Sequence, residues 1–233
     1  MPIPSPSAYR GPMAVETPDI AAAEPSPDCP FCPRLVALRE EQRALHPDWF
    51  NAPVPSFGDP QAWLAIVGLA PGMQGANRTG RPFTGDFSGP LLYETLAKFG
   101  LSEGTYAGTP DDGVTLKGAI IVSAVRCLPP QNKPTPEEIR TCRQFLEPAL
   151  DALPNLKVVV ALGQIAHQSA VKALGGKLPK MPFAHLAEHR LPSGMRLVDS
   201  YHPSRYNQNT GVITAPLFEA VFERAAALGQ AAG

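Results

Sequence analysis

The chain has 233 residues, of which 44% are hydrophobic and 18% charged, and these values suit one or two compact domains and exclude disorder throughout. Lys and Arg total 20 against 21 Asp and Glu, so the net charge of −1 gives no general attraction to nucleic acid or to an anionic membrane. A polyanion must therefore be bound by a local patch.

Proline is frequent, at 28 of 233 residues, against a usual share of about 5%. The first 30 residues are rich in Pro, Ala and Ser, so we expect residues 1–28 to form a flexible extension and residues 29–233 a single domain. No stretch approaches the roughly 18 apolar residues of a membrane span, and the N-terminus lacks the basic flank and apolar core of an export signal. We expect a soluble, cytoplasmic protein that does not bind membranes.

Strands and helices alternate along the chain. Residues 34–45 carry a helical apolar stripe, residues 62–69 form an apolar run of strand length, and residues 88–99 predict a helix that Ser88 could cap. A second strand is expected at 118–125, followed by a helix that a capping box at Thr135 opens and that carries Cys142. The remaining elements are a strand at 157–162, a helix at 164–174, a strand at 196–200 and a helix at 215–228.

This order predicts a three-layer α/β/α sandwich around a central, mostly parallel, four-stranded sheet. Polar loops of unusual composition follow three of the strands, after Leu69, Val125 and Ser200. In open α/β sheets, ligands bind in the crevice beyond the carboxyl ends of the strands. We therefore expect the three loops to converge on one site.

All four cysteines of the chain could belong to one metal centre. Cys29 and Cys32 form a C-x2-C pair in a proline-rich loop, and Cys127 and Cys142 follow much later. The alternatives are buried core thiols or disulfides, and disulfides are disfavoured in a chain without an export signal. Four thiolates fit a structural zinc or a [4Fe–4S] cluster, and the spacing does not decide between them.

The loop of residues 68–86 has the highest density of functional residue types. Its glycines let the backbone approach a ligand closely, and it also holds Arg78, Arg81, Phe83 and Asp86. It matches neither a Walker A loop nor a G-x-G-x-x-G motif, and the alternative is an ordinary tight turn. Phe83 could stack on a ring, and Asp86 could act as an acid or as a base that positions water.

The loop of residues 201–211 contributes a second candidate. His202 lies at a strand end beside Pro203 and precedes a run of hydrogen-bond donors without carboxylates. The remaining histidines lack such a context, and we expect them to be structural: His46, His167, His185 and His189.

Three segments together resemble one known family. They are G-L-A-P-G with N-R-T-G-R-P-F-T-G-D, then V-R-C-L-P-P-Q-N-K-P-T-P-E-E, and Y-H-P-S with N-x-x-T-G. These segments resemble motifs of the family 5 (type B) uracil-DNA glycosylases, and the match runs from about Cys29 to the C-terminus. The resemblance implies the uracil-DNA glycosylase fold, monofunctional excision of a damaged base from DNA, and a [4Fe–4S] cluster held by Cys29, Cys32, Cys127 and Cys142.

A glycosylase must move its nucleotide out of the base stack before the sugar–base bond can be cut. The resemblance implies that His202 donates a hydrogen bond to the base as charge develops, and that Phe83 stacks on the base. The backbone of the loop that holds Ala70, Gly72 and Met73 should line the base beside them.

Two positions depart from other uracil-DNA glycosylases. Leu69 and Ala70 stand where those enzymes carry a water-activating polar residue, so we expect Asp86, or after it Asn132, to position the water. Ser123 stands where strict uracil enzymes carry Asn, and a hydroxyl reads the base edge less fully. We therefore expect uracil and other deaminated bases, hypoxanthine in particular, as substrates.

DNA that contains such bases is the expected partner of a monomeric protein. Phosphates should be bound by residues of the same loops, and Tyr206 should fill the gap that the flipped base leaves. The residues expected to contact DNA are Arg78, Arg81, Ser204, Arg205 and Tyr206.

Two other functional classes compete with this reading. One is a catalytically inactive iron–sulfur or zinc module that binds nucleic acid, which Leu69 and Ala70 favour. The other is a small-molecule nucleoside hydrolase, which the absence of paired acids for a ribose disfavours.

Overall fold

The computed structural model describes residues 19–231, and its centre is a six-stranded sheet in the order β1-β5-β2-β6-β8-β7. The four inner strands are parallel to one another, and the two edge strands run antiparallel to their neighbours. The strands are β1 Phe57–Gly58, β2 Leu64–Gly68, β5 Ala119–Ser123, β6 Val158–Leu162, β7 Glu188–Arg190 and β8 Arg196–Ser200.

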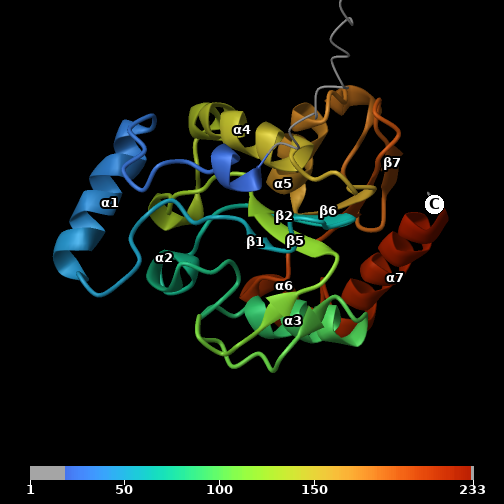
Figure 1. Ribbon diagram of the computed structural model, residues 1–233, viewed down its shortest axis with the longest axis horizontal. Coiled ribbons are helices and arrows are strands. Elements are labelled where there is room, and N and C mark those ends of the chain that lie inside the picture. Colours follow the sequence, from blue (N-terminus) through green and yellow to red (C-terminus); the bar gives the residue numbers. More distant parts are fainter. Residues whose placement is uncertain (1–18, 232–233) are drawn as a thin grey trace, which may run out of the picture.

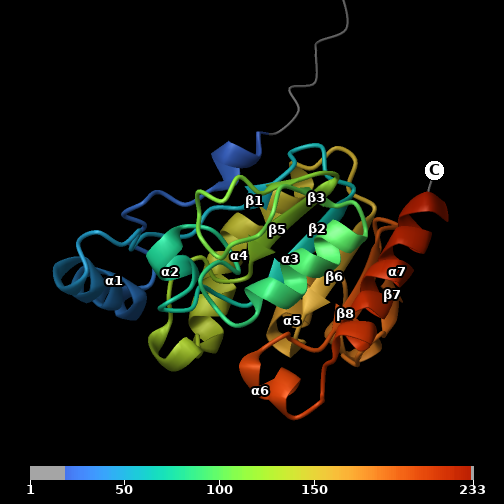
Figure 2. The same ribbon diagram turned by 90° about the horizontal axis from the view of Figure 1, so that it is seen from below.

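Helices cover both faces of this sheet (Figures 1 and 2), as a three-layer α/β/α sandwich requires. One face packs against α4 (Pro136–Asp151) and α5 (Gln164–Ala173), and the other against α3 (Gly89–Lys98) and α7 (Ala215–Ala231). Apolar side chains alternate along β2, so Leu64 and Ile66 belong to the second of these cores and Ala65 and Val67 to the first. The predicted fold class is confirmed.

The inner strands explain why the sequence could predict the fold. Every residue of β2, β5 and β6 is buried, as expected for parallel strands that helices cover on both faces. The long apolar runs that marked these strands are a consequence of this double burial. Because the inner strands are parallel, the loops after Gly68, Ser123 and Ser200 all leave the same edge of the sheet.

The sheet is nevertheless wider than the four strands expected. Strand β1 has two residues and lies in a proline-rich loop, and β7 has three residues with the polar sequence Glu-His-Arg. Neither shows the apolar alternation from which a strand can be predicted. Both lie at an edge, where one neighbour provides all the pairing.

The segment before Cys29 also differs in part from the predicted extension. Asp19 caps a 3-10 helix at Ile20–Ala23, and Ala23 is buried against the core beneath α4. Glu24 lies 3.1 Å from the guanidinium of the buried Arg126. Residues 19–24 are therefore part of the folded domain, and residues 1–18 of the predicted extension lie outside the described residues.

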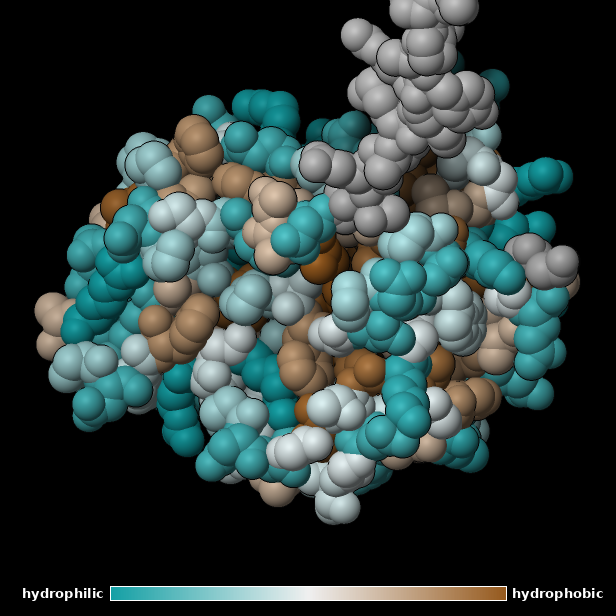
Figure 3. Space-filling view, viewed as in Figure 1, coloured by the Kyte–Doolittle hydropathy of each residue, from teal (hydrophilic) through white to brown (hydrophobic). Residues whose placement is uncertain are grey.

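Smaller elements lie around the sheet. They are α1 (Pro33–Leu45), α2 (Ala76–Thr79), α6 (Arg205–Asn209), a hairpin of β3 (Ser102–Glu103) with β4 (Thr115–Leu116), and 3-10 turns at Pro130–Asn132 and Leu178–Lys180. None of the helices within residues 19–231 combines the length and apolar character needed to cross a membrane. On the face seen in Figure 3, hydrophobic residues lie in separate small groups among hydrophilic ones.

Candidate active site and candidate metal centre

A cleft of about 1110 Å³, counted to its open mouth, lies at the carboxyl ends of β2, β5 and β8. It brings together residues from all three loops that the sequence singled out. Its walls are formed by Gly68, Leu69, Ala70, Pro71, Gly72, Ala76, Pro82, Phe83, Asp86, Phe87, Ser88, Ser123, Asn132, His202, Ser204 and Arg205. The expected convergence of the three loops is confirmed.

Phe83 forms an aromatic wall of the cleft. Its backbone has a φ of 54°, in the left-handed region that non-glycine residues seldom adopt, and its carbonyl accepts a 2.9 Å hydrogen bond from the Tyr106 hydroxyl. The ring lies against the end of β2 so closely that a Cβ on Gly68 would be 3.1 Å from the ring atom Cζ. Glycine at position 68 therefore allows a ring to be fixed here, in an orientation that can stack on a planar ligand.

One carboxylate oxygen of Asp86 is hydrogen-bonded to the protein, and the other is free to bind a ligand. Oδ1 accepts hydrogen bonds from the backbone N–H groups of Ser88 at 2.8 Å and Gly89 at 3.1 Å, at the start of α3. Oδ2 has no hydrogen-bond partner among the described residues, and the space beside it exists because residue 75 is glycine. Burial raises the pKa of Asp86, and the two N–H bonds oppose that effect. This carboxylate is fixed by one oxygen and can bind water with the other.

The side chain that accepts hydrogen bonds from the backbone N–H groups at the start of α3 is therefore that of Asp86, and not that of Ser88. The side chain of Ser88 makes no capping hydrogen bond, because Ser88 itself has helical backbone angles. The predicted cap was wrong by two positions, and the residue that does this work is also the candidate for water activation.

His202 faces Phe83 across the cleft, with ring centroids 6.0 Å apart and the planes tilted by 30°. Burial lowers the pKa of His202 to about 4. Its imidazole is therefore neutral near pH 7 and can donate one N–H without carrying a charge. The Asn207 side chain holds the following turn by donating a 2.9 Å hydrogen bond to the His202 carbonyl.

Ser123 and Asn132 complete the polar walls of the cleft. Ser123 is the last residue of β5, lies beside Gly68 of β2, and is 7% exposed. Asn132 is exposed and has a φ of 57°, next to Gln131 with a φ of 55°. Both side chains are free of hydrogen bonds to other described residues, so they are available to a ligand.

Of the residues expected to contact DNA, Ser204 and Arg205 line the cleft. The Ser204 hydroxyl caps α6, and the Arg205 guanidinium lies 5.1 Å from the centroid of the Phe87 ring. Tyr206 projects from α6 beside them and is 73% exposed. These positions remain compatible with contact to a large ligand at the mouth of the cleft.

Arg78 and Met73 lie outside the cleft. Arg78 is exposed in a neighbouring hollow that Trp49 and Phe50 also line. Met73 is exposed and is not part of the cleft wall, so the prediction that it lines a base there is not supported by its position.

Arg81 does not belong to a DNA-binding surface, contrary to expectation. It is buried, its two terminal nitrogens each lie 2.7 Å from the Asp112 carboxylate, and its Nε donates to Thr84 at 2.7 Å. The guanidinium also packs against Phe57, Tyr93 and Tyr106. The hydrogen bonds from Arg81 hold the pKa of Asp112 well below its usual range. All three nitrogens of the guanidinium are therefore engaged inside the protein.

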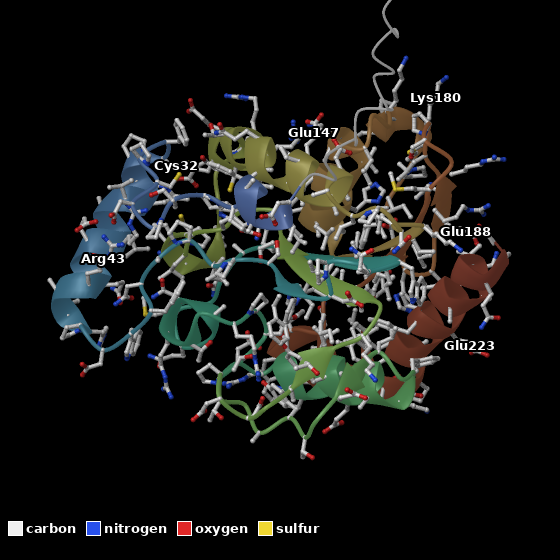
Figure 4. The ribbon with its side chains drawn as sticks, in the orientation of Figure 1. Cys32, Arg43, Glu147, Lys180, Glu188 and Glu223 are labelled. Carbon is white, nitrogen blue, oxygen red and sulfur yellow. The ribbon has the colours of Figure 1, made fainter. Side chains whose placement is uncertain are left out.

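The four cysteines, although distant in sequence, line one hollow of about 340 Å³, counted to its open mouth, between α1, α4 and the segment after β5. Figure 4 shows Cys32 between α1 and α4. The Sγ of Cys142 accepts a 3.3 Å hydrogen bond from the Arg126 N–H. Burial, with the neighbouring thiol of Cys142 adding to it, raises the pKa of Cys32 to about 11 and of Cys127 to about 12. Thiols placed this way hold their protons unless a cation replaces them.

Two buried arginines, Arg39 and Arg126, line the same hollow. Arg39 donates to the Cys29 carbonyl at 3.1 Å, while its Nε has no hydrogen-bond partner within residues 19–231. Nε and Nη2 of Arg126 are likewise buried without partners in the described chain. One carboxylate lies near each of them, Glu24 at 3.1 Å from Arg126 Nη1 and Glu40 at 3.7 Å from Arg39 Nε. The buried donors that remain without a hydrogen bond are costly unless further negative charge lies beside them. These free donors fit an anionic thiolate–metal centre.

The comparisons with known proteins agree with this geometry. The family model of the uracil DNA glycosylase superfamily matches residues 55–226. A type-5 uracil-DNA glycosylase of Thermus thermophilus is 48% identical over 196 residues, which cover 82% of this chain and 89% of the relative. That of Pyrobaculum aerophilum is 41% identical over 204 residues, covering 86% and 88%.

A third relative, the type-5 uracil-DNA glycosylase of Mycobacterium tuberculosis, is 40% identical over 206 residues, covering 84% of this chain and 76% of the relative. Among solved structures, a mimivirus UNG in complex with UGI matches 82% of this chain and 74% of its own, at 13% identity and a TM-score of 0.40. On the family match and the identities of these relatives, the chain belongs to the uracil DNA glycosylase superfamily, alongside the type-5 enzymes.

Proposed function

We propose that the protein excises uracil from DNA by hydrolysis and leaves an abasic site. The observation that carries this proposal is the meeting of Phe83, Asp86 and His202 in one cleft. They offer a ring to stack on a base, a carboxylate oxygen free to bind water and a neutral donor. The relatives named above are uracil-DNA glycosylases, which supports the same chemistry for this chain.

Substrate binding would use the part of the cleft beside Phe83. A nucleotide extruded from the duplex would place its base against Phe83, with the Ala70–Gly72 backbone beside it. The Ser123 hydroxyl lies at the end of β5, where it can donate or accept one hydrogen bond at the base edge.

The bond between sugar and base breaks toward a sugar cation and a base anion. The neutral His202 imidazole donates its N–H to the base oxygen on which negative charge develops. Asp86 holds a water molecule by Oδ2, and its negative charge stabilises the sugar cation. The water oxygen then bonds to the sugar carbon, and the proton it loses balances the charge of the departing base. Asn132 lines the same cleft and is the second candidate for holding the water.

The range of bases that the protein excises is expected to depend on Ser123. One hydroxyl, unlike the paired donor and acceptor of an amide, does not demand a pyrimidine edge. We propose that hypoxanthine is therefore also excised. Ser123→Asn should reduce excision of hypoxanthine more than that of uracil, measured on matched duplexes under single-turnover conditions. An equal loss of excision rate for both bases would mean that Ser123 contributes to packing and does not contact the base edge.

DNA would approach along the mouth of the cleft. Arg205 and Ser204 can contact phosphates beside the extruded nucleotide, and the exposed Tyr206 can occupy the gap in the stack. Arg78 could contact the backbone further along, whereas Arg81 is removed from this set by its buried pair with Asp112.

The metal centre is proposed to be a [4Fe–4S] cluster held by Cys29, Cys32, Cys127 and Cys142. Thiolates around a single tetrahedral zinc stand about 3.8 Å apart, given zinc–sulfur bonds of about 2.3 Å. The cysteines are not among the side chains of the described chain whose ligand atoms cluster within 4.8 Å. That wider spacing supports a cluster, which would supply cross-linking of α1 to α4 rather than a step of hydrolysis.

Two measurements test these proposals separately. Uracil-containing duplex, incubated with the protein and then cleaved with alkali, should yield a product at the uracil position, and intact DNA would refute the activity. Protein purified without oxygen should contain four irons and four sulfides per chain and absorb broadly near roughly 400 nm. Stoichiometric zinc without iron would refute the cluster.

A further inference from the structure

Three side chains that no part of the proposed reaction uses converge inside the protein, away from the cysteines. His167 of α5, His189 of β7 and Asp199 of β8 place their ligand atoms within 4.8 Å of one another. Nδ1 of His167 lies 2.8 Å from Asp199 Oδ1, and Nε2 of His189 lies 3.4 Å from Asp199 Oδ2. Strands β7 and β8 are hydrogen-bonded neighbours at the edge of the sheet. Asp199 and His167 are almost completely buried.

His167 has an acceptor oxygen beside each of its two ring nitrogens. Its Nε2 lies 2.9 Å from the Met181 carbonyl, which can only accept, so Nε2 carries the proton of the neutral ring. Nδ1 then presents a lone pair to a carboxylate oxygen at 2.8 Å. Two electron pairs at this distance repel in a buried site, so either a second proton or a metal cation must lie between them.

A metal accounts for the rest of the cluster better than a proton does. A proton on His167 would leave Nε2 of His189 and Oδ2 of Asp199, 3.4 Å apart, buried without a well-formed hydrogen bond between them or to any other residue within 19–231. Ligand atoms around a tetrahedral zinc, at bonds of about 2.0–2.1 Å, stand roughly 3.3 Å apart. The histidine nitrogens lie 2.8 Å and 3.4 Å from the two different oxygens of Asp199, so the carboxylate can reach a shared cation with either oxygen or with both. A carbonyl that accepts from the other ring nitrogen is the usual outer partner of a metal-bound histidine.

We propose that His167, His189 and Asp199 form a buried site for a zinc-type divalent cation that ties α5, β7 and β8 together. Two imidazoles and one carboxylate are a donor set that zinc prefers, with a fourth position left open. Asp199 precedes His202 by three residues in the strand and loop that carry it. The cation therefore fixes the strand from which the proposed base donor extends.

Zinc content of the full chain, with its cysteine centre as purified, tests this proposal. After treatment with a mild chelator, the protein is incubated with excess zinc chloride, gel-filtered and analysed for zinc. Wild type should retain about one zinc per chain more than His189→Ala, and His185→Ala, a nearby histidine outside the cluster, should match wild type. The cysteines are common to all three proteins, so the difference isolates the histidine site. Equal zinc in wild type and His189→Ala overturns the proposal and leaves a proton in the pair.

Stability and ligand type give independent readouts. Zinc at a hundred times its Kd should raise the Tm of wild type by roughly 5–10 °C and leave that of Asp199→Asn unchanged. If either variant fails to fold by circular dichroism, cadmium-113 NMR of wild type decides. A resonance in the range of nitrogen and oxygen ligands supports the site, and thiolate-type resonances alone overturn it.

Discussion

Gly75→Ala should impair hydrolysis through a single displaced carboxylate. A Cβ at this position would lie 2.8 Å from Asp86 Oδ2 and 3.0 Å from Asp86 Cβ, whereas ordinary contacts begin at 3.4 Å. The carboxylate must therefore move by about 0.6 Å, which also strains its 2.8 Å hydrogen bond from Ser88. Misplacement of a reacting group by about 1 Å can cost on the order of 100-fold in rate. We expect excision to slow by roughly 10-fold to 100-fold.

The assay is single-turnover excision of uracil with enzyme saturating, measured for Gly75→Ala, Asp86→Ala and the double variant. If the methyl group acts through Asp86, the glycine substitution should have no further effect once the carboxylate is gone. DNA affinity, measured on an uncleavable duplex, should be unchanged. If Gly75→Ala slowed excision by the same factor in wild type and in Asp86→Ala, the effect would come from a change in the loop and not from displacement of the Asp86 carboxylate.

Arg81→Ala should lower the free energy of unfolding by about 3–5 kcal/mol in urea titrations, because it leaves the Asp112 carboxylate buried without its partner. Substitution of the exposed Arg78 by Ala should change the free energy of unfolding by no more than about 0.5 kcal/mol from wild type. Similar losses for both variants would contradict the pairing of Arg81 with Asp112. Arg205→Ala should weaken DNA binding and reduce its salt dependence by about one phosphate contact. Lys180→Ala, in the 3-10 turn after α5 and outside the cleft wall, should leave that slope unchanged, and an unchanged slope in Arg205→Ala would exclude the contact. The free energy of unfolding should fall as pH drops from about 6.5 to about 4, because His202 binds a proton in the unfolded chain but stays neutral where it is buried in the folded protein. Above that pH range, His202 is neutral in both the folded and the unfolded state. Calorimetry of His202→Gln should show a flatter dependence, and identical pH curves would refute the burial effect.

The order of elements could be predicted because the inner strands are buried on both faces and so carry long apolar runs. The same reasoning missed β1 and β7, which are two and three residues long and take their conformation from one neighbouring strand. It also assigned all residues before Cys29 to an extension, although Ala23 packs into the core. Proline-rich composition does not reveal a short segment that folds onto a helix far along the chain.

The position of a site residue could be predicted where the local sequence determines it. It could not be predicted where a residue far along the chain determines it. Asp86 and His202 follow strands or loops whose geometry brings them to the sheet edge. Arg81 has the same local setting as Arg78, but Asp112, 31 residues later, pulls it inside. His167 of α5 gave no signal either, since His189 and Asp199 come from two strands later in the chain. Nothing in a single sequence shows such a pairing.

Asp86 and His202 are the residues proposed to perform the hydrolysis. Single-turnover excision of uracil by Asp86→Asn and His202→Ala, measured beside their affinities for an uncleavable duplex, tests both roles. Asp86→Asn keeps the shape of the side chain and removes its charge, and His202→Ala removes the donor. Each should slow excision by about 100-fold to 1,000-fold, with DNA affinity close to wild type. Wild-type rates in both variants would show that other residues carry out the reaction.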